Sequence, residues 1–207
     1  MQYGVDIAIT RLDDLDKRVL AAVERMVGAE ASPRVLDVGC GQGGLARALA
    51  EAGATVTALD IADYSEAIQM RTVPQIDAID FRQADIRDWV ASNTEQFDLV
   101  VLQRVLHYLP YEDARMVLEK LHSVSATLYL SVTGATTAIG QHYDAKMQPI
   151  IERWGRLDAA GQELFSISAP LCLYTESELR ELLIKTGWEI EWLRVSDFGN
   201  IKVEAKN

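Results

Sequence analysis

The stretch VLDVGCGQGG, Val35 to Gly44, places four glycines directly after a short apolar run. Glycine has no Cβ atom, so a glycine-rich backbone turns sharply and approaches a ligand closely. The residues that follow, 44–53 (GLARALAEAG), predict a helix that ends at Gly53, and the first turn of a helix has unpaired N–H groups. A strand, a glycine loop and a helix in this order predict the first unit of an α/β fold with a ligand held at the loop.

Apolar strands continue to alternate with helices after this unit. We expect strands at 54–60, 78–85, 97–103 and 126–133, and a helix at 111–124. That helix has acids in its first turn and basic residues late, as the helix dipole favours. Continuous apolar strands that alternate with helices indicate a parallel sheet covered on both faces.

Further elements are expected towards the two ends of the chain. Apolar spacing predicts a helix from Leu12 to Val27, and Thr175 with Glu178 forms a capping box for a helix through Lys185. The runs 188–195 and 199–205 predict two strands joined by a Ser-Asp-Phe-Gly turn. The fold class predicted is therefore α/β and Rossmann-like, with a seven-stranded, mostly parallel sheet that ends in an antiparallel hairpin.

A single domain over residues 1–207 accounts for the length, with residues 1–31 as an N-terminal helical segment. Residues 134–173 have no strand pattern, which predicts an insertion or a lid after the fifth strand. Its middle, AKMQPIIERWGRL, predicts a helix interrupted by Pro149.

Composition excludes several classes of protein. Lys and Arg number 20 against 31 Asp and Glu, a net charge of −11, which disfavours nucleic acid as a partner. No apolar run approaches the ~18 residues of a membrane span, and the first residues lack a signal-peptide pattern, so we expect a cytoplasmic protein. The 2 cysteines and 3 histidines lack metal-site spacing, and we expect both cysteines to be buried.

The glycine loop alone leaves two cofactor classes open. Gly39, Gly41 and Gly44 fit the G-x-G-x-x-G pattern of a dinucleotide site. Asp37, Gly39, Gly41 and Gly43 fit the acid-plus-glycines pattern of an S-adenosylmethionine site. At the end of the second strand, Asp60 can accept two hydrogen bonds from a ribose diol, which either cofactor offers. These residues therefore predict an adenosine cofactor but do not by themselves choose between the two classes.

The acids of the neighbouring strands favour the second class. Asp37 would be repelled by a diphosphate but attracted to the ammonium and sulfonium of S-adenosyl-L-methionine. Asp85 ends the third strand, where it can accept from an adenine amino group or cap the following helix. Three acids at the tips of three successive strands suit a cationic adenosine cofactor.

The chain resembles the class I S-adenosylmethionine-dependent methyltransferases from about Ser32 to its C-terminus. The resemblance is carried by VLDVGCGQG, ALDIA, QADI, FDLVVLQRVLHYLP and LYTESELRELLIKTGWEIEWL, in the usual order and spacing. It also implies that the last strand is inserted, antiparallel, beside the fifth. The resemblance implies that Asp37 and the backbone of Gly39, Cys40 and Gly41 hold the methionine end, that Asp60 binds the ribose, that Ile61 packs on adenine, that Asp85 and Ile86 read the adenine edge, and that Gln103 accepts from the methionine ammonium.

The acceptor side offers candidate catalytic groups after the fourth and fifth strands. These candidates are His107, His142 and Tyr143, with a packing role for the first and a solvated loop for the others as the alternatives. Trp154 and Phe165 are expected in the core rather than at an acceptor. No Asn/Asp-Pro-Pro-Tyr follows the fourth strand, which argues against methylation of a base or an amide nitrogen. The chain thus looks most like small-molecule methyltransferases, with a distant similarity to the tellurite-resistance branch.

Two other hypotheses stay open at this point. One is an NAD(P)-dependent oxidoreductase that uses the same glycine loop, and the other is a non-catalytic module that binds S-adenosylmethionine. The sequence does not predict the acceptor, the atom methylated or the oligomeric state.

Overall fold

The computed structural model describes residues 2–3, 13–69 and 78–207. The chain divides into two compact units. We call residues 6–102 with 123–129 the glycine-loop unit, and residues 1–5, 103–122 and 130–207 the hairpin unit. Within the described residues, no helix is both long enough and apolar enough to cross a membrane.

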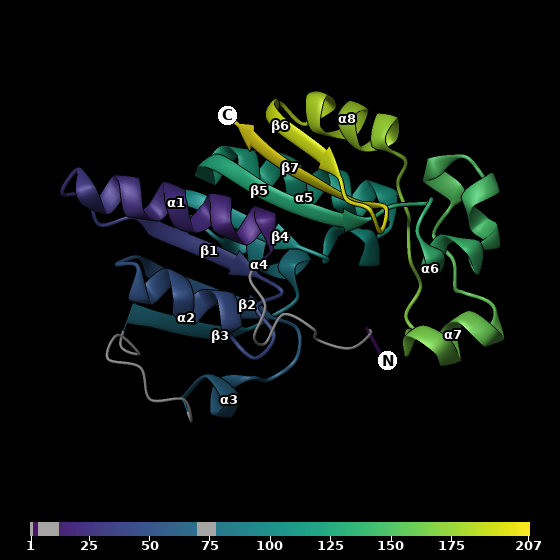
Figure 1. Ribbon diagram of the computed structural model, residues 1–207, viewed down its shortest axis with the longest axis horizontal. Coiled ribbons are helices and arrows are strands. Elements are labelled where there is room, and N and C mark those ends of the chain that lie inside the picture. The colour runs from purple at the N-terminus through teal and green to yellow at the C-terminus, as the bar shows by residue number, and fades with distance from the viewer. Residues whose placement is uncertain (1, 4–12, 70–77) are drawn as a thin grey trace. The chain divides into compact units, whose positions relative to one another are not determined.

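The strands are β1 (Arg34–Val38), β2 (Thr55–Asp60), β3 (Ile79–Gln83), β4 (Phe97–Gln103), β5 (Ser125–Thr133), β6 (Glu189–Val195) and β7 (Asn200–Lys206). They form a seven-stranded sheet in the order β3-β2-β1-β4-β5-β7-β6 (Figure 1). β1 pairs in parallel with β2 and β4, β2 pairs in parallel with β3, and β6 pairs antiparallel with β7. The predicted fold class is confirmed, including the insertion of the last strand beside the fifth.

The helices follow the predicted alternation. They are α1 (Asp14–Gly28), α2 (Gly44–Glu51), α3 (Ser65–Gln69), α4 (Ile86–Ser92), α5 (Tyr111–Val124), α6 (Ala138–Gln141), α7 (Ala159–Phe165) and α8 (Glu176–Lys185). Short 3-10 turns also occur, among them η2 (Leu106–Tyr108), η3 (Asp144–Met147) and η4 (Ile150–Glu152).

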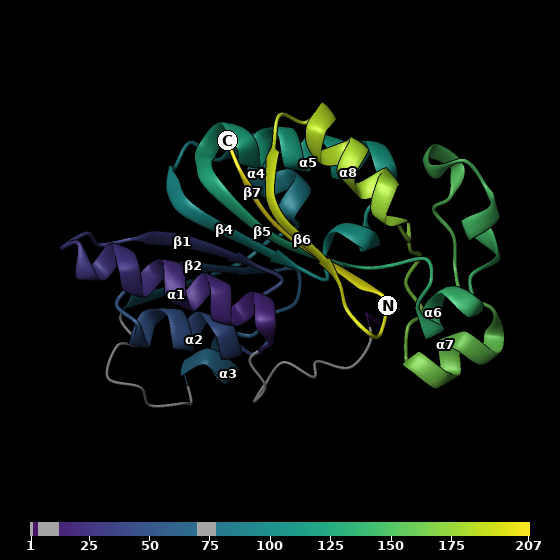
Figure 2. The ribbon, with the colours of Figure 1, turned by 45° about the horizontal axis from the view of Figure 1, so that its top comes forward.

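In the glycine-loop unit, α1 lies beside α2 (Figures 1 and 2). The described part of the predicted N-terminal helix begins at Asp14 because Asp13 caps it, and Asp16 completes a capping box. Leu12, where the prediction began, lies outside the described residues. The buried face of α1 includes Leu15 and Val19, so the helix is held by apolar packing as well as by its cap.

In the hairpin unit, α8 packs on β6. The predicted capping box of Thr175 and Glu178 is confirmed. The predicted turn between β6 and β7 is also confirmed, because the Gly199 N–H donates to the Ser196 carbonyl at 2.8 Å. Trp188, fully buried, donates through Nε1 to the Leu118 carbonyl of α5 at 3.1 Å, which fixes the start of the hairpin.

Residues 134–173 contain α6, η3, η4 and α7. The prediction of a helix interrupted by Pro149 is wrong, because two 3-10 turns flank an extended Gln148 instead. Proline disfavours helical backbone at the residue before it, which explains the break. The segment has a small core of its own, with partly buried Tyr108 and Phe165 packed against five buried side chains: Tyr143, Leu157, Ile167, Leu171 and Leu173.

Three burial predictions have mixed outcomes. Cys172 is buried as expected, whereas Cys40 in the glycine loop is partly exposed, so the prediction that both are buried is wrong for Cys40. Phe165 packs in the core of residues 134–173 as expected. Trp154 is 46% exposed, so its predicted core position is wrong.

Candidate functional site

The glycine loop after β1 is held in a left-handed conformation at three positions. Gly39, Gly41 and Gly43 have φ values of 73°, 51° and 74°. The N–H groups of Gly39 and Cys40 both donate to the carbonyl of Leu59 in β2, at 2.7 and 3.1 Å. Because left-handed backbone favours residues without a Cβ, this path explains the spacing of the glycines.

Asp60 joins the loop to the end of β2. Its Oδ2 atom accepts from the Gly41 N–H at 2.9 Å, and its Oδ1 atom accepts from the Ala62 N–H at 3.0 Å. Each carboxylate oxygen has a further lone pair, so the ribose contact predicted for Asp60 is compatible with both bonds. Ile61, predicted to pack on adenine, follows directly and is 49% exposed.

Asp37, near the end of β1, is the most unusual group of the loop. It is 4% exposed, and its Oδ2 atom has no hydrogen-bond partner among the described residues. Burial, with smaller effects of the charges of Asp16 and Asp60, raises the pKa of Asp37 to about 7. A buried carboxylate oxygen without a partner is costly, and a cationic ligand would satisfy it.

Asp85 is the N-cap of α4, which confirms one of the two roles predicted for it. Its Oδ1 atom accepts from the Arg87 N–H at 2.9 Å, and its Oδ2 atom pairs with the Arg87 guanidinium at 2.6 Å. Hydrogen bonds from that guanidinium lower the pKa of Asp85. An adenine amino group would share these oxygens with Arg87, and the adenine contact of Asp85 and of the buried Ile86 stays a prediction.

Gln103 and His107 lie in the hairpin unit, at and just after the end of β4. The Gln103 Oε1 atom accepts from the Ser131 hydroxyl at 3.4 Å, and its contact with the cofactor stays a prediction. His107 is 2% exposed, and its Nδ1 atom accepts from the Thr133 N–H at 3.4 Å. Burial, with a smaller effect of Arg104, lowers the pKa of His107 to about 3, so its imidazole is neutral and a weak base.

His142 has the geometry of an oriented base. Its Nδ1 atom lies 3.1 Å from both carboxylate oxygens of Asp158, so in the neutral tautomer that donates Nδ1–H to Asp158 the Nε2 atom carries a lone pair. Asp158 also caps α7 by accepting from the Gly161 N–H at 2.6 Å. A Cβ at Gly161 would come within 2.4 Å of the His142 Cβ, so glycine is needed there for close packing. The sequence analysis did not identify Asp158 because the two side chains are paired at long range.

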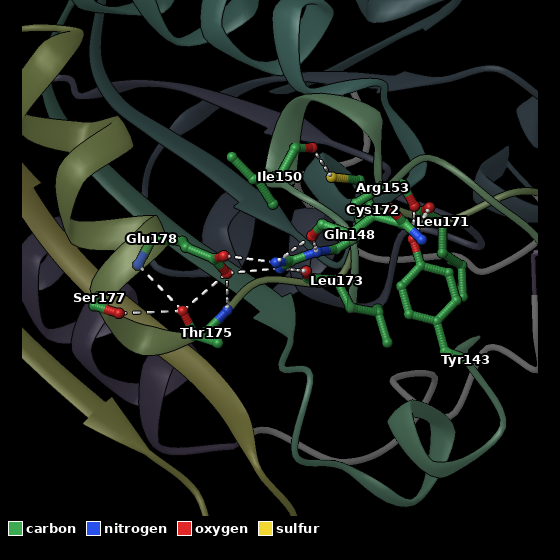
Figure 3. A network of polar contacts seen from close by, with 10 residues as sticks. All are labelled: Tyr143, Gln148, Ile150, Arg153, Leu171, Cys172, Leu173, Thr175, Ser177 and Glu178. Atoms are coloured by element: carbon green, nitrogen blue, oxygen red, sulfur yellow. Dashed lines mark hydrogen bonds and ion pairs between the residues drawn. The ribbon is translucent and has the colours of Figure 1, made fainter. Parts of the chain in front are cut away.

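Tyr143 is fully buried in the core of residues 134–173 (Figure 3). Its hydroxyl lies against the backbone carbonyls of Arg153 and Leu171, the latter at 2.5 Å. Burial raises the pKa of Tyr143 well above its usual range. The hydroxyl is therefore engaged in holding the segment together, and its assignment as a catalytic group stays a prediction.

Arg153 connects this segment to the start of α8 (Figure 3). Its guanidinium makes two bonds of 2.7 Å to Glu178, and it also donates to the carbonyls of Gln148 and Leu173. Burial would raise the pKa of Glu178, but the hydrogen bonds from Arg153 and Thr175 outweigh it and lower that pKa. A paired, nearly buried arginine therefore holds residues 134–173 against the cap of α8.

A hollow of about 490 Å³ lies beside this segment. Its volume falls in the range of small-molecule sites. The hollow is lined by polar side chains whose exposed surface there is mainly apolar, together with one alanine: Ala135, Thr136, Thr137, Gln141, Lys146 and Thr175.

Residues 35–127 match a family model described as a methyltransferase domain. Ubiquinone biosynthesis O-methyltransferase of Xanthomonas campestris pv. campestris is 32% identical over 126 residues, covering 56% of this chain and 52% of that protein. The enzyme of the same description from Actinobacillus pleuropneumoniae is 32% identical over 130 residues, covering 56% of this chain and 55% of that protein. The chain thus spans about half the length of these curated relatives.

Solved structures share the fold over nearly the whole chain. Magnesium protoporphyrin IX methyltransferase from Synechocystis, with bound SAH, has a TM-score of 0.62 at 21% identity and covers 95% of this chain and 89% of its own. An S-adenosylmethionine-dependent methyltransferase from Mesorhizobium loti has a TM-score of 0.65 at 19% identity, covering 93% and 98%. The predicted Rossmann-like fold is thus shared with solved methyltransferases, and residues 35–127 are similar to a methyltransferase domain.

Proposed function

We propose that the chain transfers a methyl group from S-adenosyl-L-methionine to a small-molecule acceptor. The observation that carries this proposal is the buried carboxylate of Asp37, whose Oδ2 atom has no partner among the described residues beside a left-handed glycine loop. When bound, the cofactor would supply an electrophilic methyl group on a sulfonium, to which the acceptor bonds by in-line displacement while the carbon–sulfur bond breaks and S-adenosylhomocysteine leaves. The residues of the loop fit a cationic adenosine, because an uncompensated carboxylate attracts a cation and repels a diphosphate.

Each residue of the loop has a proposed role toward this cofactor. Asp37 faces the cationic methionine end together with the backbone of residues 39–41, and Asp60 accepts from the ribose hydroxyls beside Ile61. The adenine edge is read by the N-cap and the first residue of α4, and the methionine ammonium donates to the side chain of the last residue of β4. The residues assigned to these last two contacts are Asp85, Ile86 and Gln103.

Asp60→Ala is expected to weaken S-adenosylhomocysteine binding by ~1.5–3 kcal/mol, because a charge-assisted ribose contact is lost. Isothermal titration calorimetry on the wild-type chain and the variant measures this difference. Asp63→Asn, which changes an exposed carboxylate three residues further on, is the control and should bind as the wild type does. Equal affinity for the wild type and Asp60→Ala would contradict the assignment.

The two cofactor classes make opposite expectations in a thermal-shift assay. A methyltransferase is stabilised by S-adenosylhomocysteine and not by NAD or NADP, because only the former places a cation beside Asp37. Stabilisation by NAD alone would instead favour the oxidoreductase hypothesis. A chain that binds S-adenosylmethionine but transfers no methyl group to any acceptor would be the non-catalytic module.

The general base of the proposed reaction is His142, positioned by Asp158. The His142 Nε2 atom keeps its lone pair while Nδ1–H donates to the carboxylate, an arrangement that suits removal of a proton from a hydroxyl acceptor. The O-methyltransferase names of the relatives support an oxygen acceptor. His107 and Tyr143 are the other two predicted catalytic groups. Both are buried, and we propose that they pack on the acceptor side rather than transfer a proton.

His142→Ala is expected to lower the methyl-transfer rate by about 10²-fold or more, with cofactor affinity unchanged. Asp158→Asn should cause a loss of similar order, because asparagine keeps the helix cap but no longer fixes the imidazole tautomer. Formation of S-adenosylhomocysteine with a small-molecule extract as the acceptor source measures both. The control is Asp144→Asn, an exposed acid of the same segment, and a full rate in Asp158→Asn would contradict the assignment.

The chain acts as one methyltransferase domain, with residues 134–173 as an insertion or lid on the acceptor side. It acts in the cytoplasm and does not act on nucleic acid. The names of the similar methyltransferases support a small-molecule acceptor. We place it in the hollow that Lys146 helps to line.

A further inference from the structure

We propose that the hollow of about 490 Å³ binds a carboxylate of the acceptor, with the Lys146 ammonium as its counter-charge and the side chains of Gln141 and Thr136 as further donors. The inference rests on the proposed function and deepens it, because it names the acceptor as an acid. All residues that line the hollow lie in the hairpin unit and outside residues 35–127. The match to the methyltransferase family model therefore assigns none of them.

Lys146 is held at the hollow by its own segment. It belongs to η3, where its N–H donates to the Tyr143 carbonyl at 3.2 Å, and its Nζ atom donates to the Gly140 carbonyl at 2.6 Å. Gly140 is packed tightly in turn, because a Cβ there would come within 2.1 Å of the Ala135 carbonyl oxygen. An ammonium has three N–H bonds, so the bond to Gly140 leaves two for a ligand.

The charge of Lys146 is not balanced by an acid of the lining. None of the lining residues is acidic, and within the described residues the bond to the Gly140 carbonyl is the one contact of the ammonium. Glu178 accepts from the hydroxyl of Thr175, a lining residue, at 2.8 Å, but this carboxylate is already paired with Arg153 at 2.7 Å (Figure 3). The lining therefore attracts an anionic group locally, although the chain as a whole has a net charge of −11.

The other polar side chains of the lining divide into two pairs. Thr137 caps α6 by accepting from the Gly140 N–H at 3.2 Å, and Thr175 caps α8, so these hydroxyls are used within the fold. Thr136 and Gln141 are exposed, and neither side chain has a hydrogen bond within the described residues. A hydroxyl and an amide that are open to a ligand beside an ammonium form a donor set for a carboxylate.

The rest of the hollow fits an apolar body. The exposed surface of the lining is mainly apolar, because threonine methyl groups, the Ala135 side chain and the aliphatic stem of Lys146 contribute to it. The acceptor class that this combination fits is an acid with an apolar body, such as an aromatic or aliphatic hydroxy acid. Its carboxylate faces the ammonium, and its hydroxyl receives the methyl group.

The carboxylate is a handle for binding and takes no part in the transfer. Gln141 directly precedes His142, the proposed base, so one short segment supplies groups for the carboxylate and for the hydroxyl. The hydroxyl O–H bond breaks as its proton passes to the His142 Nε2 atom. The new oxygen–methyl bond forms as the carbon–sulfur bond breaks, and the bonding pair leaves with the sulfur of S-adenosylhomocysteine. The product keeps the negative charge of the acceptor.

A titration of the whole ¹⁵N-labelled chain with benzoate tests the hollow directly by nuclear magnetic resonance. Benzoate carries one carboxylate on an apolar ring, and benzamide, which has the same shape without the charge, is the control ligand. We expect benzoate to shift the amide signals of residues 135–137, 141 and 146 in a saturable way. It should bind at least about tenfold more tightly than benzamide, because a charge-assisted bond is made only with the former.

Lys146→Met keeps the aliphatic stem and removes the charge, so the benzoate affinity should fall at least about tenfold. Lys146→Arg keeps the charge and should retain most of the affinity. Lys185→Met is the matched control, because it removes an exposed lysine from α8 in the same unit and should bind benzoate as the wild type does. All three variants should bind S-adenosylhomocysteine with wild-type affinity.

The product of the reaction gives a second readout. With methyl-labelled S-adenosylmethionine and a small-molecule extract, the labelled product should be retained by an anion exchanger at pH 7. It should be released at about pH 2.5, where a carboxyl group is protonated. A phosphorylated product would stay bound at that pH, and a methyl ester or another neutral product would not be retained at all. Either result would overturn the inference and leave methyl transfer established.

Two binding results would also overturn the inference while leaving the proposed function intact. One is equal binding of benzoate and benzamide to the wild type, which decides even if Lys146→Met does not fold. The other is wild-type benzoate affinity in Lys146→Met. A chain that does not bind S-adenosylhomocysteine would instead defeat the proposed function, and with it the assignment of the carboxylate to a methyl acceptor.

Discussion

Asp37→Asn is expected to stabilise the free protein by about 2–4 kcal/mol at pH 8 while cofactor affinity falls at least tenfold. Burial raises the pKa of Asp37 from 3.8 to about 7 in the folded chain. A raised carboxyl pKa gives stability that is complete below about pH 4 and is lost as the pH rises to about 7. Asparagine carries no charge, so the variant avoids this loss.

Thermal unfolding of the wild type and the variant at pH 4.5 and pH 8 measures the effect. We expect the variant to melt at least about 5 °C higher at pH 8, and the two proteins to differ little at pH 4.5. Asp85→Asn is the control, because the Arg87 ion pair lowers the pKa of Asp85 and its removal should give no gain. A variant less stable than the wild type at pH 8 would show that Asp37 has a partner in the free protein.

Arg153→Met is expected to destabilise the protein by about 3–5 kcal/mol, because it leaves Glu178 without its ion pair in a largely buried place. The Arg153 side chain is 7% exposed, and its donors also reach the carbonyls of Gln148 and Leu173. These two carbonyls and the Glu178 carboxylate would all lose the hydrogen bonds that the Arg153 guanidinium donates. Residues 134–173 should then detach from the cap of α8 more often than in the wild type.

Urea unfolding measures the loss of stability, and limited proteolysis measures the exposure of residues 134–173. The matched control is Arg180→Met. It breaks an exposed ion pair between Arg180 and Glu176, both on α8, and should lower the free energy of unfolding by at most about 0.5 kcal/mol. Equal losses in Arg153→Met and Arg180→Met would show that burial of the Arg153–Glu178 pair contributes nothing.

Most of the fold follows from local patterns in the sequence. Strand β4 and helices α5 and α8 have the predicted bounds, because each has a continuous apolar run or a helical period. The capping box of Thr175 and Glu178 is also local, since its two residues lie one turn apart. The helix predicted around Pro149 is an exception. Its composition is helical, but composition does not show that proline divides the segment into two 3-10 turns.

The sequence predicted only those residues of the candidate site that lie at the ends of strands. The position of Asp37 and Asp60 at the ends of β1 and β2 follows from the parallel sheet, in which successive strands end at one edge. The partners Asp16, Asp158 and Arg153 act on residues 16 to 25 positions away in the chain. No local period marks such pairs, because tertiary packing decides which polar groups are brought together.

The position of Asp158 links the order of one short helix to the proposed chemistry. The same carboxylate accepts from the Gly161 N–H at the start of α7 and from the His142 imidazole. When the first turn of α7 opens, the carboxylate loses the backbone bond that fixes it, and the imidazole loses its orientation with it. The exchange rate of the Gly161 amide hydrogen is thus a spectroscopic measure of how often His142 is oriented, readable before any acceptor is known.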